Sequence, residues 1–202
     1  MESTKVAVYI HGLHGSSEEA GFYSFLSGFD VIGIPYQDGN PWEVGPAVAS
    51  KVLKAIAPYE EAVVIAPSIG AFYAYHYLRS PKIKRAFFLS PLASMHSAIF
   101  SKMMDAGIYS DDLKEKKFVK LKDGTLLSYD FYMEVSNPDL DWTVPTEILY
   151  GMNDTVVCQE DVVEFAADHN AAVTYLRGAE HWIHKDEEMA FVKEWILRRL
   201  RF

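Results

Sequence analysis

The chain has 202 residues, a length that fits one α/β domain. Half of the residues are hydrophobic and 23% are charged, which is typical of a globular protein and excludes a disordered or fibrous one. The formal net charge of -9 argues against binding to phosphate backbones, so we expect no nucleic-acid partner.

Six short runs rich in β-branched and aromatic residues alternate with longer segments of helical character. All but the last run are almost continuously apolar, as strands buried on both faces require. The alternation predicts the α/β class, with a doubly wound, mostly parallel sheet of about six strands and helices on both faces. The predicted strands are Lys5–His11, Phe29–Pro35, Glu61–Pro67, Ile83–Leu89, Glu147–Tyr150 and Val173–Leu176.

Four segments between and after these strands have apolar residues at helical spacing. In the first of them, valines and an isoleucine recur every four residues from Val44 to Ile56. We therefore expect helices that cross over the sheet. The predicted helices are Trp42–Ala57, Ile69–Leu78, Gln159–His169 and Asp186–Leu200.

The stretch 91–142, after the fourth predicted strand, breaks this rhythm. It predicts a helix over Ala93–Asp105, a hairpin over Phe118–Leu127 and a short helix over Tyr129–Val135. We interpret it as a lid inserted into a single domain of residues 1–202. Its apolar side chains either contact a substrate or only seal the lid to the sheet. They are Met95, Phe100, Met103, Met104, Tyr109, Phe131, Tyr132 and Met133.

The chain shows no signal for export or membrane insertion. Met1 to Lys5 lead directly into a short apolar run without the pattern of a secretory signal. Apolar stretches such as 62–66 are far shorter than the roughly 20 residues that cross a bilayer. Cys158, the single cysteine, cannot form an intramolecular disulfide and fits a reducing compartment, so we expect a cytoplasmic protein without a membrane partner.

Ser68 lies between a predicted strand and a predicted helix, in the sequence Ala66-Pro67-Ser68-Ile69-Gly70. A serine hydroxyl becomes a useful nucleophile when a sharp turn exposes it and a base removes its proton, and small residues two positions away allow that turn. The segment is the A-x-S-x-G form of the G-x-S-x-G nucleophile elbow. The alternative is that Ser68 only caps the following helix.

The loop His11-Gly12-Leu13-His14-Gly15-Ser16-Ser17 follows the first predicted strand. Acyl transfer places negative charge on a carbonyl oxygen, which backbone N–H groups stabilise. We expect one donor from Leu13 or a neighbour and the second from Ile69. The same loop can also be a plain turn in which Ser16 or Ser17 caps a helix, while the His11 ring braces it.

Two further loops follow predicted strands and carry an acid and a base. In Gly151-Met152-Asn153-Asp154, Asp154 can orient a histidine, although an Asn-Asp pair also forms ordinary turns. In the later loop, His181 is the candidate base and His184 its competitor. We favour His181 because it is nearer the end of the strand.

Taken together, these motifs resemble those of a compact α/β-hydrolase. The motifs H-G-L-H-G-S, A-P-S-I-G, L-Y-G-M-N-D and G-A-E-H-W cover nearly the whole length. The resemblance implies Ser68, Asp154 and His181 as the catalytic triad, with Leu13 and Ile69 as the oxyanion hole. This chain departs from larger family members in lacking their first two strands and in having Ala66 and Pro67 at the elbow.

Other site types have weaker support. The pairs His11/His14 and His181/His184 raise the possibility of a metal site, but three-residue spacing on loops does not fix two imidazoles on one face, so we expect no metal. No nucleotide-binding motif is present, and we expect no cofactor. A catalytically silent module that binds a ligand or a partner protein is the alternative to an enzyme.

The expected activity is therefore hydrolysis of a small-molecule substrate by a serine hydrolase through an acyl-enzyme. A carboxylesterase is the favoured subtype, and thioesterase, lactonase and peptidase activities stay open.

Overall fold

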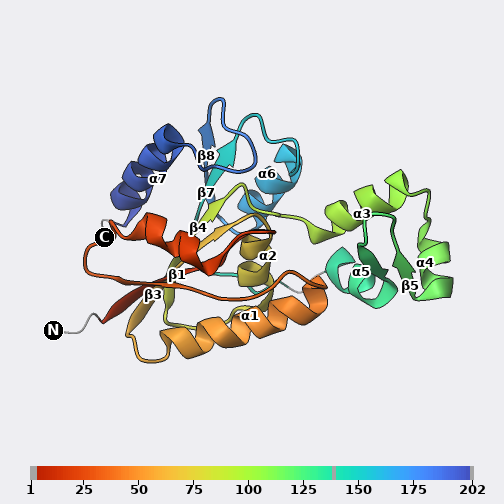
Figure 1. Cartoon of the computed structure of the whole chain (residues 1–202), viewed down its shortest axis with the longest axis horizontal. Coiled ribbons are helices and arrows are strands. Elements are labelled where there is room, and N and C mark those ends of the chain that lie inside the picture. The colour runs from red at the N-terminus through yellow and green to blue at the C-terminus, as the bar shows by residue number, and fades with distance from the viewer. Residues whose placement is uncertain (1–3, 138–139, 201–202) are drawn as a thin grey trace. The chain divides into compact units, whose positions relative to one another are not determined.

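The structure is a computed structural model that describes residues 4–137 and 140–200 (Figure 1). Residues 1–3, which belong to the start examined for an export signal, lie outside these ranges, as do residues 138–139 of the expected lid and residues 201–202. Within the described ranges, no helix combines the length and the apolar character that crossing a membrane requires.

The main sheet has six strands, and every neighbouring pair in it is parallel. This confirms the predicted fold class. The strands are β1 (Lys5–Tyr9), β2 (Asp30–Gly33), β3 (Glu61–Pro67), β4 (Ile83–Leu89), β7 (Thr146–Gly151) and β8 (Ala172–Leu176). They lie in the order β2-β1-β3-β4-β7-β8, so the strand order reverses direction between β1 and β3. Open α/β sheets bind ligands at such a point, outside the carboxyl ends of the strands.

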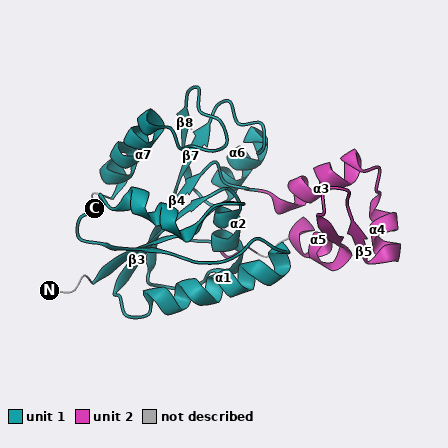
Figure 2. Cartoon of the chain, viewed as in Figure 1, with its two compact units in different colours: residues 1–93, 142–202 teal, residues 94–141 magenta. Residues whose placement is uncertain are grey.

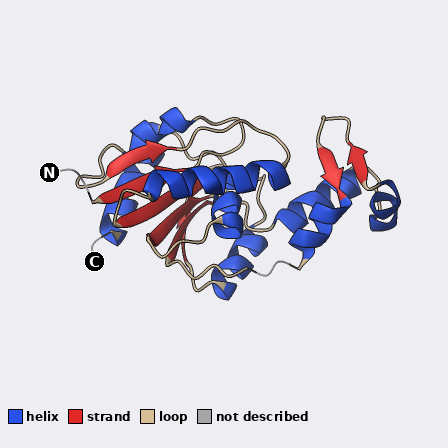
Figure 3. Ribbon diagram, turned by 90° about the horizontal axis from the view of Figure 1, so that it is seen from below, coloured by secondary structure: helices blue, strands red, loops and turns tan. Residues whose placement is uncertain are grey.

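Helices flank both faces of the sheet (Figure 3). Consecutive residues of a strand point to opposite faces. On β4, the Phe87 ring packs against Trp195 of α7 (Asp186–Arg199), whereas the Phe88 ring packs against Phe165 of α6 (Gln159–Asp168). The α7 face also buries residues of η1, a 3-10 helix over Ser17–Tyr23.

Two helices carry the crossovers around β3. They are α1 (Pro41–Ile56) and α2 (Ser68–Tyr77), and they pack against each other. The Tyr75 ring of α2 contacts Phe165 of α6, which places α2 on the α6 face. All four predicted helices are present, and each end differs from the prediction by at most one residue.

The strands β3 and β4 have the predicted bounds, but β1 ends two residues earlier than predicted and β2 is shorter at both ends. Ile10 and His11 leave the sheet to form the loop that follows β1. At Gly33, a Cβ atom would lie 1.9 Å from the Ser17 carbonyl oxygen. The start of η1 therefore passes directly over the end of β2.

The insertion forms a compact unit of its own, residues 94–141 (Figure 2). The predicted first helix, hairpin and last helix are present, and α4 was not predicted. The elements are α3 (Met95–Asp105), α4 (Ser110–Lys116), β5 (Phe118–Lys120), β6 (Leu126–Ser128) and α5 (Tyr129–Ser136). Of the apolar residues named above, Met95, Met103 and Phe131 are buried, whereas Phe100, Met104, Tyr109 and Met133 are exposed. The role of residues 91–142 as a lid stays a prediction.

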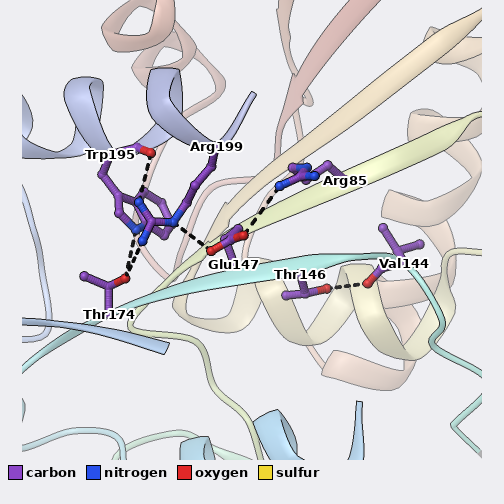
Figure 4. Close-up of polar contacts among 7 residues, drawn as sticks. All are labelled: Arg85, Val144, Thr146, Glu147, Thr174, Trp195 and Arg199. Atoms are coloured by element: carbon purple, nitrogen blue, oxygen red, sulfur yellow. Dashed lines mark hydrogen bonds and ion pairs between the residues drawn. The ribbon is translucent and has the colours of Figure 1, made fainter. Parts of the chain in front are cut away.

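A polar network fastens α7 to the strands at the opposite end from the loops described below (Figure 4). The Glu147 carboxylate of β7 accepts from Arg199 Nε at 2.7 Å and from an Arg85 nitrogen at 3.4 Å. Arg199 and the Trp195 indole also donate to the Thr174 hydroxyl, each at 3.1 Å. The Glu147 side chain is 16% exposed, so these partners replace much of the water that would otherwise hydrogen-bond to its carboxylate.

Candidate active site

Ser68 stands on a sharp turn between β3 and α2. Its φ of 48° is in the left-handed region that L-residues rarely adopt. Gly70 allows the helix after this turn to pass close to the loop after β1, because a Cβ atom there would lie 2.2 Å from the Ile10 carbonyl oxygen. The turn forms with Pro67 in extended conformation before it and with a fully buried Ala66. The A-x-S-x-G segment therefore has the backbone geometry of an elbow.

The Ser68 hydroxyl is hydrogen-bonded to His181. The distance from Oγ to Nε2 is 2.9 Å, and on the other side of the ring Nδ1 lies 2.8 Å from Asp154 Oδ2. A carboxylate only accepts, so these partners assign the ring proton to Nδ1. Nε2 is then the acceptor for the Ser68 O–H. The structure thus brings together all three residues of the predicted triad in one hydrogen-bonded chain.

Asp154 is held as a buried carboxylate. Its side chain is 0% exposed, and Oδ1 accepts from the amides of Val156 at 2.8 Å and Val157 at 3.0 Å. Burial raises the pKa of Asp154, but the hydrogen bonds from His181, Val157 and Val156 together outweigh burial and hold the pKa below its usual value. The acid is therefore oriented and kept ionised by hydrogen bonds from His181 and the two amides.

The loops that carry Asp154 and His181 are tied to each other. The Asn153 amide donates to the Ala179 carbonyl at 2.8 Å. A Cβ atom at Gly151 would lie 2.5 Å from the Glu180 carbonyl oxygen, so glycine permits this close approach. The spacing between acid and histidine is therefore set by backbone contacts rather than by the two side chains alone.

His184, the competing base, is engaged elsewhere. Its ring stacks on Trp182 with 3.7 Å between centroids, and Nδ1 lies 2.7 Å from the Trp182 carbonyl oxygen. Its backbone amide donates to the buried Glu188 carboxylate at 3.0 Å. His181, and not His184, is thus the histidine that contacts Ser68.

The loop after β1 lies against the serine. A Cβ atom at Gly12 would be 3.4 Å from the Ser68 Cβ, and Leu13 follows immediately. The amide of Ile69, the second residue of α2, is one of the helix N–H groups that have no acceptor within the helix. Ile69 thus follows Ser68 in the chain, Leu13 lines the same pocket as Ser68, and their role as the oxyanion hole stays a prediction.

His11 and Asp38 fix the shape of this loop. The buried His11 ring stacks on Tyr36 at 3.7 Å, and its Nδ1 donates to the Gly12 carbonyl at 2.8 Å. The Tyr36 hydroxyl donates to the His11 carbonyl. Asp38 accepts from both the amide and Nδ1 of His14, each at 2.9 Å. The pattern of the sequence pointed to His11 as a brace but not to Tyr36 or Asp38, which lie more than 20 residues away.

A pocket of about 370 Å³ opens beside Ser68. Its lining residues belong to the main α/β unit and are mostly apolar or aromatic. They are Tyr9, Gly12, Leu13, His14, Gly15, Glu19, Phe22, Tyr23, Pro67, Ser68, Leu89, Val156, His181, Trp182, Ile183, His184 and Met189. Sequence analysis did not single out Glu19, although Ser16 and Glu19 have the spacing of a helix capping box and could have been found by it.

The histidine pairs do not converge on a shared centre. Within residues 4–137 and 140–200, no group of three or more His, Cys, Asp or Glu side chains is arranged to hold a metal ion. The ring nitrogens of His11, His14, His181 and His184 contact different partners, and no two of these histidines share one.

Comparison with known proteins gives a likeness of structure only. No family model matches the chain, and no curated protein matches it in sequence. Among solved structures, Est1E from Butyrivibrio proteoclasticus is similar with a TM-score of 0.72 and 18% identity, over 100% of this chain and 90% of that one. Mouse alpha/beta hydrolase domain-containing protein 10 gives 0.68 and 18%, over 98% and 90%. A monoacylglycerol lipase of Paleococcus ferrophilus gives 0.62 and 15%, over 95% and 93%.

Proposed function

We propose that this chain, which has the α/β-hydrolase fold, is a serine hydrolase that cleaves an ester bond of a small-molecule substrate through an acyl-enzyme. The observation that carries the proposal is the hydrogen-bonded chain from Ser68 Oγ through His181 to the buried Asp154 carboxylate. Ser68, at one end of this series of hydrogen bonds, lines a mostly apolar pocket that can hold an acyl group.

In the first half of the reaction, the Ser68 oxygen attacks the carbonyl carbon of the ester while His181 Nε2 takes the hydroxyl proton. The amides of Leu13 and Ile69 stabilise the negative charge that develops on the carbonyl oxygen. The bond to the alcohol then breaks, and the alcohol leaves with the proton from His181. Ser68 is left as an acyl ester.

In the second half, water attacks the acyl carbon and gives its proton to His181. The acid leaves, and Ser68 regains its proton from the histidine. Asp154 keeps the Nδ1–H tautomer throughout and stabilises the imidazolium that forms in each half. The two amide hydrogen bonds to Oδ1 leave Oδ2 free to face the ring.

The substrate class rests on the pocket and on the structural neighbours. An ester is consistent with structural neighbours that include an esterase from a marine microorganism and the monoacylglycerol lipase, and one structure of Est1E holds ferulic acid. The apolar lining suits an acyl group of moderate size. The single cysteine supports placing the reaction in the cytoplasm.

The proposal is tested with a fluorophosphonate probe, which reacts with activated serines. We expect the wild-type protein to be labelled and Ser68→Ala to be unlabelled. Ser27→Ala, an exposed serine far along the chain from the elbow, is the matched control and should be labelled like the wild type. A folded wild-type protein that neither reacts with the probe nor cleaves esters of graded chain length would refute the enzyme and favour a silent binding module.

A further inference from the structure

Glu19 gives the pocket beside Ser68 a negative charge. Among the described residues that line this pocket, Glu19 is the only carboxylate, and none is a lysine or an arginine. The rest of the lining is apolar, aromatic, backbone or histidine. A single charge in such surroundings is screened less than at an open surface, so it acts strongly on a bound ligand.

The orientation of Glu19 is fixed by two donors. Oε1 accepts from the Ser16 amide at 3.0 Å, and Oε2 accepts from the Tyr9 hydroxyl at 2.5 Å. Burial raises the pKa of Tyr9 far above its usual value, and Tyr23 and Glu19 add to the effect, so Tyr9 keeps its proton and stays a donor. A carboxylate has about four acceptor positions. Two donors therefore hold Glu19 and leave it capacity for a third, from a ligand.

Aromatic rings surround the same space. Tyr9 and Tyr23 are both buried, with their centroids 5.3 Å apart, and Phe22 and Trp182 line the pocket with exposed rings. Ring faces attract cations. A carboxylate together with several ring faces suits a positively charged amine better than a neutral or anionic group.

The turn between Gly12 and Gly15 sets the length that we expect for the ligand. The Gly15 amide donates to the Gly12 carbonyl at 3.1 Å, which closes a four-residue turn. Ser68 packs near Gly12, and Glu19 Oε1 packs near Gly15. The Cα atoms of Gly12 and Gly15, the residues beside Ser68 and Glu19, are within about 7 Å of each other in such a turn. We take this span as the guide to ligand length, and an extended chain of roughly six bonds covers it.

We propose that Glu19 is a specificity-determining residue that selects acyl groups with a cationic amine about six bonds from the carbonyl carbon. This inference rests on the proposed function, because it takes Ser68 as the acceptor of the acyl group. It assigns the Ser16–Glu19 capping box a second role in addition to starting η1.

The test compares kcat/KM for four 4-nitrophenyl esters that differ only at the far end of the acyl chain: hexanoyl, 6-hydroxyhexanoyl, 6-aminohexanoyl and the adipoyl monoester. For the wild type we expect the amine to be best and the carboxylate to be worst. Glu19→Gln should lower the ratio of amine to hexanoyl by about tenfold, because a charge-assisted hydrogen bond is replaced by a neutral one. The ratio cancels any general change in activity.

Glu18→Gln is the matched control, because it removes the same charge from an exposed neighbour on the same helix that does not line the pocket. It should keep the wild-type ratio. If Glu19→Gln does not fold, the wild-type ranking decides alone. A wild-type enzyme that cleaves the hexanoyl ester as well as the amine, or a ratio that Glu19→Gln leaves unchanged, would overturn the inference and leave the hydrolase intact.

A binding measurement separates this inference from the proposed function. Calorimetry with hexylamine and with hexanol needs no reaction at Ser68. Tighter binding of the amine to the wild type, lost in Glu19→Gln, supports the inference even if the fluorophosphonate probe fails to label Ser68. Equal binding of the two ligands would refute it whatever the outcome of the labelling.

Discussion

Replacing Asp154 by asparagine tests the proposed triad most directly. The substitution keeps the size of the side chain, and Oδ1 of asparagine can still accept from the amides of Val156 and Val157. The amide group of asparagine then faces His181 Nδ1, where Asp154 Oδ2 lies at 2.8 Å in the wild type. Because that group is a donor, it favours the tautomer that carries the proton on Nε2. Nε2 can then no longer accept the Ser68 proton.

The expected loss follows from this change of tautomer. We expect kcat to fall by about 10⁴-fold, which corresponds to roughly 5.5 kcal/mol of transition-state stabilisation, with KM little changed. The assay is steady-state hydrolysis of a 4-nitrophenyl ester, with circular dichroism to show that the protein is folded. Asp168→Asn, at an exposed position in α6, is the matched control. A folded Asp154→Asn protein with kcat within tenfold of the wild type would refute the reasoning.

Three further predictions concern the scaffold. Gly70→Ala should lower the free energy of unfolding by about 1–3 kcal/mol, because the added Cβ atom meets the Ile10 carbonyl oxygen. Gly21→Ala, which adds a Cβ atom where the space is empty, should not destabilise the protein, and urea unfolding measures both variants. Glu147→Gln should lower the free energy of unfolding by about 1.5–3 kcal/mol in the same assay, because it weakens the hydrogen bonds to Arg199 and Arg85. It should leave kcat unchanged, because these partners lie away from the loops at the site, and a loss of kcat above threefold would contradict this. Burial raises the pKa of Glu188, but hydrogen bonds from the amides of Lys185 and His184 outweigh burial and hold the pKa below its usual value. The contribution of Glu188 to stability is therefore present above the unfolded-state pKa of 4.5 and is lost as pH falls through the lower, folded-state pKa; Glu188→Gln should flatten this acid limb of the stability curve, and an unchanged limb would exclude Glu188 as its source.

The main sheet could be predicted from the sequence because its strands are buried on both faces. The strands β3 and β4 are buried and apolar over residues 62–66 and 86–89, and the bounds of both were predicted to the residue. The helix α4 was missed because Ser110–Lys116 has only one buried residue, Leu113, and hence no apolar periodicity. The bounds of the 3-10 helix η1 were not predicted, although Ser16, which caps it, was one of the two serines named as capping candidates.

The candidate site was predictable as a set of residues but not as a geometry. Chain order and strand ends pointed to Ser68, Asp154 and His181, since each follows a strand of a parallel sheet. The choice between His181 and His184 depends on the path of one loop, which stacks His184 on Trp182. Asp38 could not be identified because its contact to His14 joins segments that are distant in sequence, and the capping-box spacing of Glu19 does not reveal its contact to Tyr9.

The spacing of the triad depends on how closely its loops approach one another. At Gly70 the helix after Ser68 passes against the Ile10 carbonyl, and at Gly151 the strand before Asp154 passes against the Glu180 carbonyl. A Cβ atom at either position would clash with the carbonyl oxygen, so glycine allows the two backbone segments to pack directly against each other. The loop with His181 is thereby fixed to the loop with Asp154, and the turn at Ser68 is fixed to the loop after β1. The Ser68–His181 hydrogen bond joins these two pairs of loops. We therefore expect a change at either glycine to disturb catalysis without altering a catalytic side chain.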